Sequence, residues 1–352
     1  GEPVPYRELH VFRRGEEALT ELPEVHKWKD QSLANIHFGA SSDALRMIRR
    51  DRLWQKLELI EVDLDTRDLR VLVEESLSWS TLEGGAGFGN QYQARYVEHG
   101  GDFLWWSERT GWGHFYLYDY EGNLKHPVTE GAWRAGSMAA VDSVARVAWV
   151  VGLGRESGES PYQEHLYRTS LDNPGLTLLN PEAYDHDVSL SPSRRFVVDR
   201  YSSPDAPWRS VLRDGRNGEV VMELEDLDVT PLEELGWRPP EPFVVKSADG
   251  VTDIYGNMWQ PFDFDPERKY PVIASVYPGP QSEGYSTTFN AGASQQSLAQ
   301  LGFIVIQLGN RGGSPFRSAA YKAHSYQDLR DYGLADKKAG IEELAAKHSF
   351  ID

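Results

Sequence analysis

Short apolar runs separated by polar turns recur along the chain from about residue 40 to residue 225. They form four units of three strands, and the first strands begin at residues 45, 103, 146 and 195, which are 58, 43 and 49 residues apart. Small antiparallel sheets repeated every ~40–50 residues are typical of β-propeller blades. The pattern therefore predicts four blades of a larger propeller, preceded by β-like residues 1–38. A β-sandwich with regular hairpins is the alternative.

After residue 225 the pattern changes to alternating strands and helices. We predict, in order, a hairpin over 243–261 that turns at 248–250, a strand over 270–276, a helix over 294–302, a strand over 303–309, and a helix that opens with a capping box at Ser325-Tyr326-Gln327-Asp328. Both later strands lack polar alternation, as do strands covered on both faces of a parallel sheet. The chain is thus divided into part of a propeller, residues 1–238, and an α/β layer, residues 239–352.

The final helix has apolar residues at helical spacing, which predicts the face that it turns to the core. These residues are Leu329, Tyr332, Leu334, Ile341, Leu344 and Ala345.

Composition narrows the classes of function. The 352 residues carry a net charge of −18 with a pI near 5.0, so the chain repels phosphate backbones and nucleic acid is not an expected partner. There is no cysteine, which excludes disulfides, thiolate metal sites and a cysteine nucleophile. No apolar stretch approaches the ~20 residues that span a bilayer. The histidines at 114, 126, 165 and 186 lack metal-ligand spacing, and no metal or other cofactor is predicted.

Several long motifs resemble one known family. The segments "KYPVIASVYPGPQ", "LAQLGFIVIQLGNRGG" and "YGLADKKAGIEELAAKHSFID" are similar to the first half of the α/β-hydrolase domain of the prolyl oligopeptidase family, dipeptidyl peptidase IV branch. The segments "FLWWSERTGWGHFYLYDYEGNLKHPVT" and "HDVSLSPSRRFVVDRYSSPD" resemble the late propeller blades of that branch. The resemblance covers nearly the whole chain. It implies a bacterial serine exopeptidase that acts on short peptides in the periplasm or outside the cell, and that forms homodimers.

The resemblance also implies site residues. Tyr277 matches the family tyrosine whose phenol donates a hydrogen bond to the oxyanion, and Pro278, Gly279 and Pro280 form the oxyanion turn that follows it. Many relatives have Gly or Ala at the position of Pro278 and Asp at the position of Gly309. Asn310 and Arg311 are candidates for a loop at the cavity, although a structural salt bridge is an equal alternative for Arg311.

The nucleophile of the family is not found in this sequence. An α/β-hydrolase carries its serine in a G-x-S-x-G elbow, and none of the 352 residues form that motif. In the family the elbow follows about ten residues after the segment that matches Phe350-Ile351-Asp352. We therefore expect the chain to be an internal piece of a longer enzyme and to be inactive by itself. His324 and His348 precede any elbow, so surface or packing roles are expected for both.

Two other functions remain open at this stage. The first is a non-catalytic propeller that binds peptides or proteins. The second is an acylaminoacyl or tripeptidyl peptidase of the same family. The paired glutamates of the chain lack the surrounding motif of the glutamates with which dipeptidyl peptidases bind a substrate amino terminus, so release of dipeptides follows from the resemblance alone.

Overall fold

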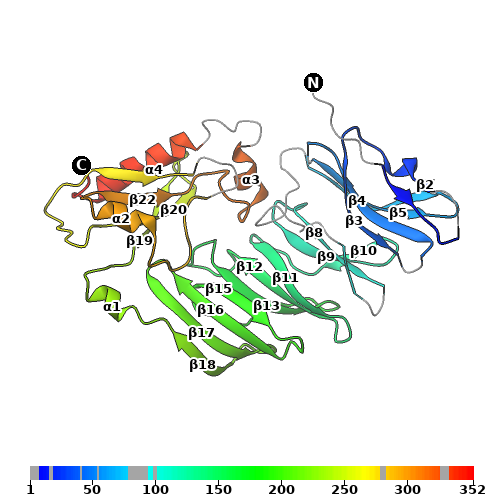
Figure 1. The fold of residues 1–352 in the computed structure, drawn as a ribbon, viewed down its shortest axis with the longest axis horizontal. Helices are drawn as coiled ribbons and strands as arrows, with labels where there is room; N and C mark the ends of the chain where they lie inside the picture. The colour runs from blue at the N-terminus through cyan, green and yellow to red at the C-terminus, as the bar shows by residue number, and fades with distance from the viewer. Residues whose placement is uncertain are drawn as a thin grey trace. The chain divides into compact units, whose positions relative to one another are not determined.

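The computed structural model describes residues 8–15, 19–39, 42–53, 55–77, 94–97, 101–277, 283–325 and 333–352. The chain divides into two compact units, residues 1–130 and residues 131–352. Figure 1 shows the elements by label and colour. The domain boundary predicted at residues 238 and 239 lies inside the second unit, between its last blade sheet and the α/β part.

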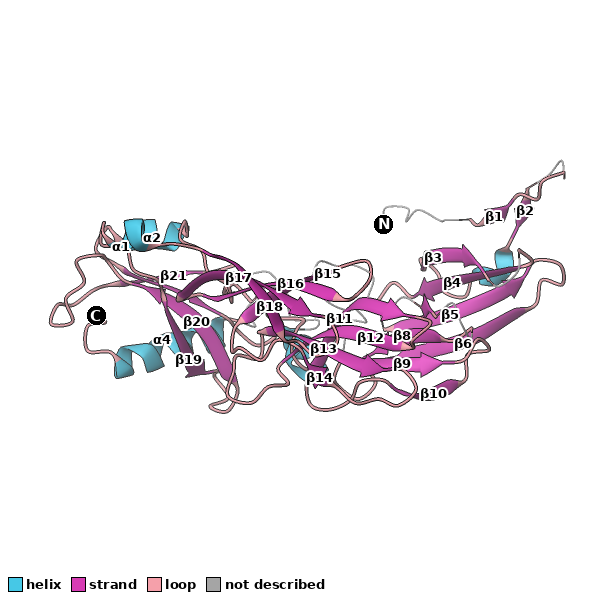
Figure 2. Ribbon diagram, turned by 90° about the horizontal axis from the view of Figure 1, so that it is seen from below, coloured by secondary structure: helices cyan, strands magenta, loops and turns pink. Residues whose placement is uncertain are grey.

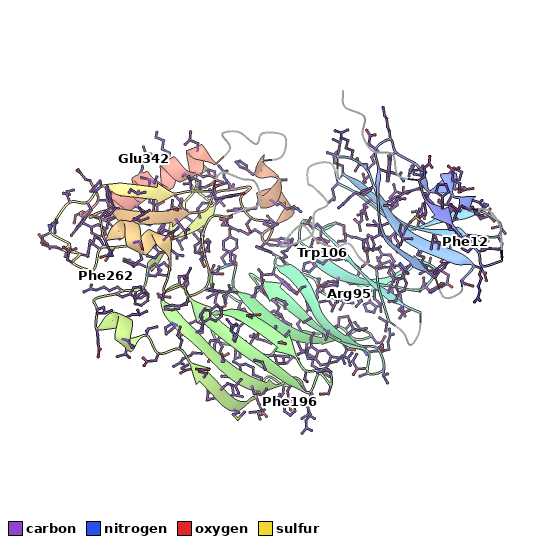
Figure 3. The ribbon with its side chains drawn as sticks, in the orientation of Figure 1. Phe12, Arg95, Trp106, Phe196, Phe262 and Glu342 are labelled. Atoms are coloured by element: carbon purple, nitrogen blue, oxygen red, sulfur yellow. The ribbon has the colours of Figure 1, made fainter. Side chains whose placement is uncertain are left out.

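The first unit contains two four-stranded antiparallel sheets and a small ribbon. The ribbon pairs β1 (His10–Val11) with β2 (Thr20–Glu21). The first sheet contains β3 (Ser32–Phe38), β4 (Ala44–Arg50), β5 (Lys56–Asp63) and β6 (Leu69–Ser76). The second sheet contains β7 (Arg95–Tyr96), β8 (Phe103–Ser107), β9 (His114–Tyr118) and β10 (Leu124–Pro127). All five residues of β8 and of β9 are buried, and Trp106 of β8 is labelled in Figure 3.

The second unit begins with two more sheets of the same kind, which lie side by side (Figure 1). One contains β11 (Arg134–Asp142), β12 (Val147–Leu153), β13 (Glu164–Ser170) and β14 (Thr177–Leu178). The other contains β15 (Asp185–Leu190), β16 (Phe196–Ser203), β17 (Ala206–Asp214) and β18 (Val220–Asp226). The indole Nε1 of Trp149 in β12 donates to the backbone oxygen of Gly215 in the neighbouring sheet at 2.6 Å.

These four sheets confirm the predicted blades and correct their composition. The strand that sequence analysis placed first is the second strand of every sheet, because each sheet begins with a further strand: β3, β7, β11 and β15. Two of these have sequences rich in small and polar residues, "RAGSMAAVD" and "DHDVSL". Such sequences lack the apolar runs from which a strand is recognised.

The α/β part is a mixed four-stranded sheet in the order β19-β20-β22-β21. Its strands are β19 (Glu241–Lys246), β20 (Asp253–Trp259), β21 (Val272–Ser275) and β22 (Ile304–Leu308). The predicted hairpin is confirmed by the antiparallel pair β19-β20, and the two later strands, β21 and β22, are parallel as predicted; β20 joins the two pairs by lying antiparallel to β22. A tight turn can join antiparallel strands, and residues 247–252 form that turn.

Helices cover both faces of this sheet. They are α2 (Ser294–Ala299) and α4 (Leu334–Lys347), and Figure 2 shows them on opposite sides of the strands. Leu344 of α4 packs with Ile306 and Leu308, whereas Ala299 of α2 packs with Val305. Successive residues of a strand point to opposite faces, so the apolar run Ile304-Val305-Ile306 of β22 serves both helices. The short helices α1 (Thr230–Glu233) and α3 (Ala319–Lys322) lie outside these layers of the sheet.

The core face of α4 agrees with the predicted one at Ile341 and Leu344 and differs from it elsewhere. Leu334 is 68% exposed and Ala345 is also exposed, while Asp336, Gly340 and Leu344 are buried. Arg311 and the backbone of residue 248 bind the Asp336 carboxylate, so a polar residue occupies a position that apolar spacing could not reveal. Glu342 lies on the opposite, outer face (Figure 3). Most of the predicted capping box, like Leu329 and Tyr332, lies outside the described residues.

Two smaller corrections concern the strand and the helix before β22. All four residues of β21 are half-buried rather than fully covered, because β21 is the edge strand of the described sheet and pairs only with β22. Helix α2 ends at Ala299, and a turn leads to Gly302, whose φ of 94° favours glycine.

In the part of the chain that the structure describes, no helix is long and apolar enough to span a membrane.

Candidate functional site

Tyr277 lies two residues beyond β21, at the carboxyl end of the strand. The parallel register from Val272 beside Ile304 to Ser275 beside Gln307 brings the ends of β21 and β22 to the same edge of the sheet. Tyr277 is 62% exposed there. Its phenol is therefore accessible to a molecule at this edge, which is where α/β sheets bind ligands. The predicted turn residues Pro278, Gly279 and Pro280 lie outside the described residues.

Gly284 lies beside the backbone of Tyr277. Gly284 has a φ of 69°, and a Cβ added to it would lie 3.8 Å from the backbone nitrogen of Tyr277. An L-residue rarely adopts this backbone conformation, so glycine permits the close approach. The placement of Tyr277 is thus coupled to that of residues 283 and 284.

Asn310 and Arg311 follow β22 at the same edge, and the side chains of both make hydrogen bonds within the protein. The Arg311 guanidinium donates to Asp336 at 2.8 Å and to Asp249 at 2.8 Å. Burial acts to raise the pKa of Asp336, but hydrogen bonds from Arg311 outweigh it and the pKa is lowered. Asn310 is 3% exposed, and its amide Nδ2 donates to the Arg311 carbonyl oxygen at 2.9 Å. These contacts agree with the salt bridge that sequence analysis left open for Arg311.

A cavity of about 530 Å³ lies between the blade sheet β11–β14 and the α/β part, within the second unit. The blade side contributes Tyr162 and Glu164, and the neighbouring sheet contributes Asp185. The α/β side contributes Glu283, Tyr285 and Thr287. The cavity is therefore lined by acidic and phenolic groups.

The Glu283 carboxyl group is held by two of the phenols around it. Its Oε1 accepts from the hydroxyls of Tyr162 and Tyr321, each at 2.8 Å, whereas Oε2 has neither solvent contact nor a hydrogen-bond partner among the described residues. Burial raises the pKa of Glu283 to about 7, against the effect of the two phenols. The carboxyl also occupies the space beside Gly309, because a Cβ added there would lie 2.1 Å from Oε1.

Glu164 and Asp185 form the other acidic part of the lining. Burial, followed by the charges of Asp185 and Asp187, raises the pKa of Glu164 to about 7. Burial also raises the pKa of Asp185, although its carboxylate accepts hydrogen bonds from the Thr287 hydroxyl and from the backbone N–H of Glu164. Thr287 belongs to the α/β part, so the hydrogen bond that its hydroxyl donates to Asp185 joins the α/β part to the blades.

The histidines have the structural roles that the sequence predicts. Nδ1 of His114 lies 3.1 Å from the Thr129 hydroxyl, Nδ1 of His126 lies 3.0 Å from the Pro127 carbonyl oxygen, and Nδ1 of His165 lies 2.8 Å from the Asn180 carbonyl oxygen. His186 hydrogen-bonds the Asp199 carboxylate at 2.9 Å. His324 is exposed, and the ring of His348 lies 5.0 Å from that of Phe350. In the described ranges, no group of three or more His, Asp and Glu residues could hold a metal ion.

No sequence motif marks Glu283, Tyr162 or Tyr321 as a site residue. Glu283 lies 121 residues from Tyr162 and 38 residues from Tyr321, so no local spacing connects them. One signal was available: glycine at 309 leaves room for a side chain from elsewhere. It could not reveal which side chain enters.

The chain is similar to known dipeptidyl peptidases. Residues 1–208 match the family described as Dipeptidyl peptidase IV (DPP IV) N-terminal region. Over 238 residues the chain is 29% identical to dipeptidyl peptidase 8 of Homo sapiens. This alignment covers 64% of the chain and 26% of that protein. It is 25% identical over 363 aligned positions to the probable dipeptidyl-aminopeptidase B of Emericella nidulans, covering 99% of the chain and 39% of that protein.

The fold is also similar to that of a solved dipeptidyl peptidase structure. Porphyromonas gingivalis dipeptidyl peptidase 4 superposes with a TM-score of 0.81 at 21% identity, over 98% of the chain and 47% of that structure. The chain thus spans from about a quarter to about half of the length of these relatives. The family match covers more than half of the chain, from β1 to β17. The chain belongs to the dipeptidyl peptidase IV family.

Proposed function

We propose that the chain is part of a serine exopeptidase that releases dipeptides of the Xaa-Pro or Xaa-Ala type from the amino termini of short peptides. The relatives named above are dipeptidyl peptidases, which supports this class of reaction. The observation that carries the proposal for this chain is the exposed phenol of Tyr277 at the carboxyl end of β21. We place the enzyme in the periplasm or outside the cell, as a homodimer.

The role of Tyr277 follows from the chemistry of acyl transfer. When a serine hydroxyl attacks the peptide carbonyl carbon, the C=O bond becomes a single bond and its oxygen takes the negative charge. A phenol O–H already oriented toward that oxygen stabilises the charge without reorganisation of solvent. One such donor typically lowers the barrier by ~3–4 kcal/mol. The 352 residues contain no G-x-S-x-G elbow, so we propose that serine, aspartate and histidine come from sequence beyond them.

Tyr277→Phe in the full-length enzyme tests the proposal. We expect kcat on a Gly-Pro or Ala-Pro reporter to fall by about 10²–10³, with a small change in KM, because the donor acts on the transition state. Tyr184→Phe is the matched control: the Tyr184 ring packs against that of Tyr201 in the blades, so this substitution should leave kcat unchanged.

Other results would contradict the proposal. Unchanged kcat in Tyr277→Phe removes its catalytic role, and faster cleavage of an acyl-peptide reporter indicates an acylaminoacyl peptidase. If the full-length protein cleaves no reporter, the binding module becomes the better interpretation. A fluorophosphonate probe should label the full-length enzyme but not the 352-residue chain, which lacks the elbow.

A further inference from the structure

The carboxyl group of Glu283 connects three segments that are distant in sequence. It accepts hydrogen bonds from Tyr162, which follows β12 in the blades, and from Tyr321 in α3. It also lies against the backbone of Gly309, just after β22. One side chain thereby joins a blade, the short helix α3 and the carboxyl edge of the α/β sheet.

This carboxyl is also close to Tyr277 along the backbone. Glu283 follows Tyr277 by six positions, and Gly284 lies beside the Tyr277 backbone nitrogen. A residue held in place at 283 therefore restricts where the backbone of residue 277 can lie. Tyr277 itself is 62% exposed, so few side-chain contacts are available to fix it.

Cationic and phenolic groups surround Glu283. The Arg317 guanidinium lies 4.3 Å from the Tyr321 ring centroid and 5.9 Å from that of Tyr162. The Lys337 ammonium donates to the Leu308 carbonyl oxygen. Both charges act to lower the pKa of Glu283, yet burial dominates and raises it to about 7. The carboxyl can therefore change its charge near neutral pH.

We propose that Glu283 is the positioning residue for Tyr277: its carboxyl, beside Gly309 and held by the Tyr162 and Tyr321 hydroxyls, fixes the neighbouring Gly284 against the Tyr277 backbone and thereby positions the Tyr277 phenol at the edge of the sheet. The catalytic meaning of this placement rests on the proposed function. The contacts themselves do not depend on it.

A double-mutant cycle tests the contact between the Glu283 carboxyl and Gly309. Gly309→Ala places a methyl group where Oε1 lies and should displace the carboxyl, lowering Tm by about 2–4 °C. A Glu283→Ala background lacks the three atoms nearest to the added methyl group, so the same substitution should change Tm by less than about 1 °C there. Additive effects of the two substitutions on Tm would contradict the contact between the Glu283 carboxyl and Gly309. Gly175→Ala is the control, because no atom lies within 4 Å of the added Cβ.

A spectroscopic probe tests the effect on residue 277 directly. Tyr277 is replaced by 4-fluorophenylalanine, which does not titrate, and its ¹⁹F resonance is followed from pH 5.5 to 8.5. We expect one resonance whose shift titrates with a midpoint near pH 7, the pKa of Glu283. Glu283→Ala should move or broaden the resonance at every pH. Glu283→Gln keeps an oxygen acceptor for the two phenols, so it should restore the resonance position and abolish the titration.

Controls separate this inference from others. Glu164→Gln removes a second carboxyl of the same cavity with a raised pKa and should leave the ¹⁹F titration in place. If the ¹⁹F resonance keeps its position and width in Glu283→Ala, Glu283 does not position residue 277. The same conclusion follows if the shift still titrates near pH 7 in Glu283→Gln. Neither readout requires hydrolysis, so an inactive enzyme with an intact coupling contradicts only the proposed function. An active enzyme without coupling contradicts only this inference.

Discussion

Two carboxyl groups in the second unit show how neighbours decide the charge of a residue. Asp199 is fully buried, and its oxygens accept from His186 at 2.9 Å and from Arg213 at 2.7 Å. Burial acts to raise the pKa of Asp199, but the hydrogen bonds and charges of His186 and Arg213 outweigh burial, so the pKa is lowered. Among the residues that the structure describes, no comparable donor reaches the Glu164 carboxyl, and burial together with Asp185 and Asp187 raises its pKa to about 7. Partners rather than depth alone therefore set the charge.

Glu164 predicts a pH dependence of stability. Its folded pKa, about 7, lies above the ordinary value of 4.5, so the folded state holds the proton more tightly than the unfolded state. The resulting stability is fully present below about pH 4.5 and is lost as pH rises toward 7. Glu164→Gln should flatten this part of the Tm–pH curve and raise Tm above pH 7. Thermal unfolding between pH 4.5 and 8 measures this.

The control for this experiment is Glu223→Gln, on the exposed strand β18. It should leave the slope of the curve unchanged. Part of the slope should also remain in Glu164→Gln, because Glu283 contributes in the same range of pH. A wild-type curve that rises with pH between 4.5 and 7 would contradict the assignment of either group.

At the scale of elements, the site depends on how closely the strands of the mixed sheet approach one another. Gly256 of β20 lies opposite Phe243 of β19 and opposite Leu308 of β22. A Cβ added to it would lie 2.3 Å from the Gln307 carbonyl oxygen and 2.4 Å from the Phe243 ring. Glycine is thus required for steric reasons in a central strand, where it otherwise weakens a sheet.

Gly256→Ala should therefore destabilise the second unit. We expect a loss of about 1–3 kcal/mol, since overpacking forces backbone or aromatic groups to shift. Urea unfolding followed by tryptophan fluorescence measures the free energy of unfolding. Gly175→Ala, with open space around its Cβ, should cost less than about 0.5 kcal/mol. Equal effects of the two substitutions would show that the strands can separate without strain.

At the scale of the whole molecule, each of the two compact units contains its own buried apolar cluster. The first unit buries Leu22, Met47 and Ile60 in one cluster. The second buries Ile254, Ile306 and Leu344 in another. Chains with several cores commonly depart from two-state unfolding. Each unit should therefore respond to its own substitutions.

We predict two transitions in differential scanning calorimetry. Met47→Ala should lower one of them and Ile306→Ala the other, each by several degrees, because truncation of a buried residue costs about 2–5 kcal/mol. Each variant serves as the control for the other. A single transition that both variants lower equally would show that the units unfold together.

Much of the fold was predictable from the sequence because its signals are local. Blade strands such as β12 and β16 are continuous or alternating apolar runs, and the glycine at 302 marks the turn after α2. The position of Tyr277 just after an apolar strand was predictable for the same reason. The first strands of the blades were missed because their small and polar residues resemble loops. The face of α4 was right at Ile341 and Leu344 but missed Asp336, because a buried ion pair replaces an apolar contact there.

The sequence by itself determined the repeat of blades, the change to an α/β part and the tyrosine after β21, since each depends on residues within one element or one turn. Tertiary structure alone decided that Glu283 lies beside Gly309, that Tyr162 and Tyr321 bind it, and that Arg311 pairs with Asp249 and Asp336. These partners are 25 to 121 residues apart along the chain. The physical reason is that burial and hydrogen bonding act through space, so the packing of blades on the sheet sets which side chains share a low-dielectric site.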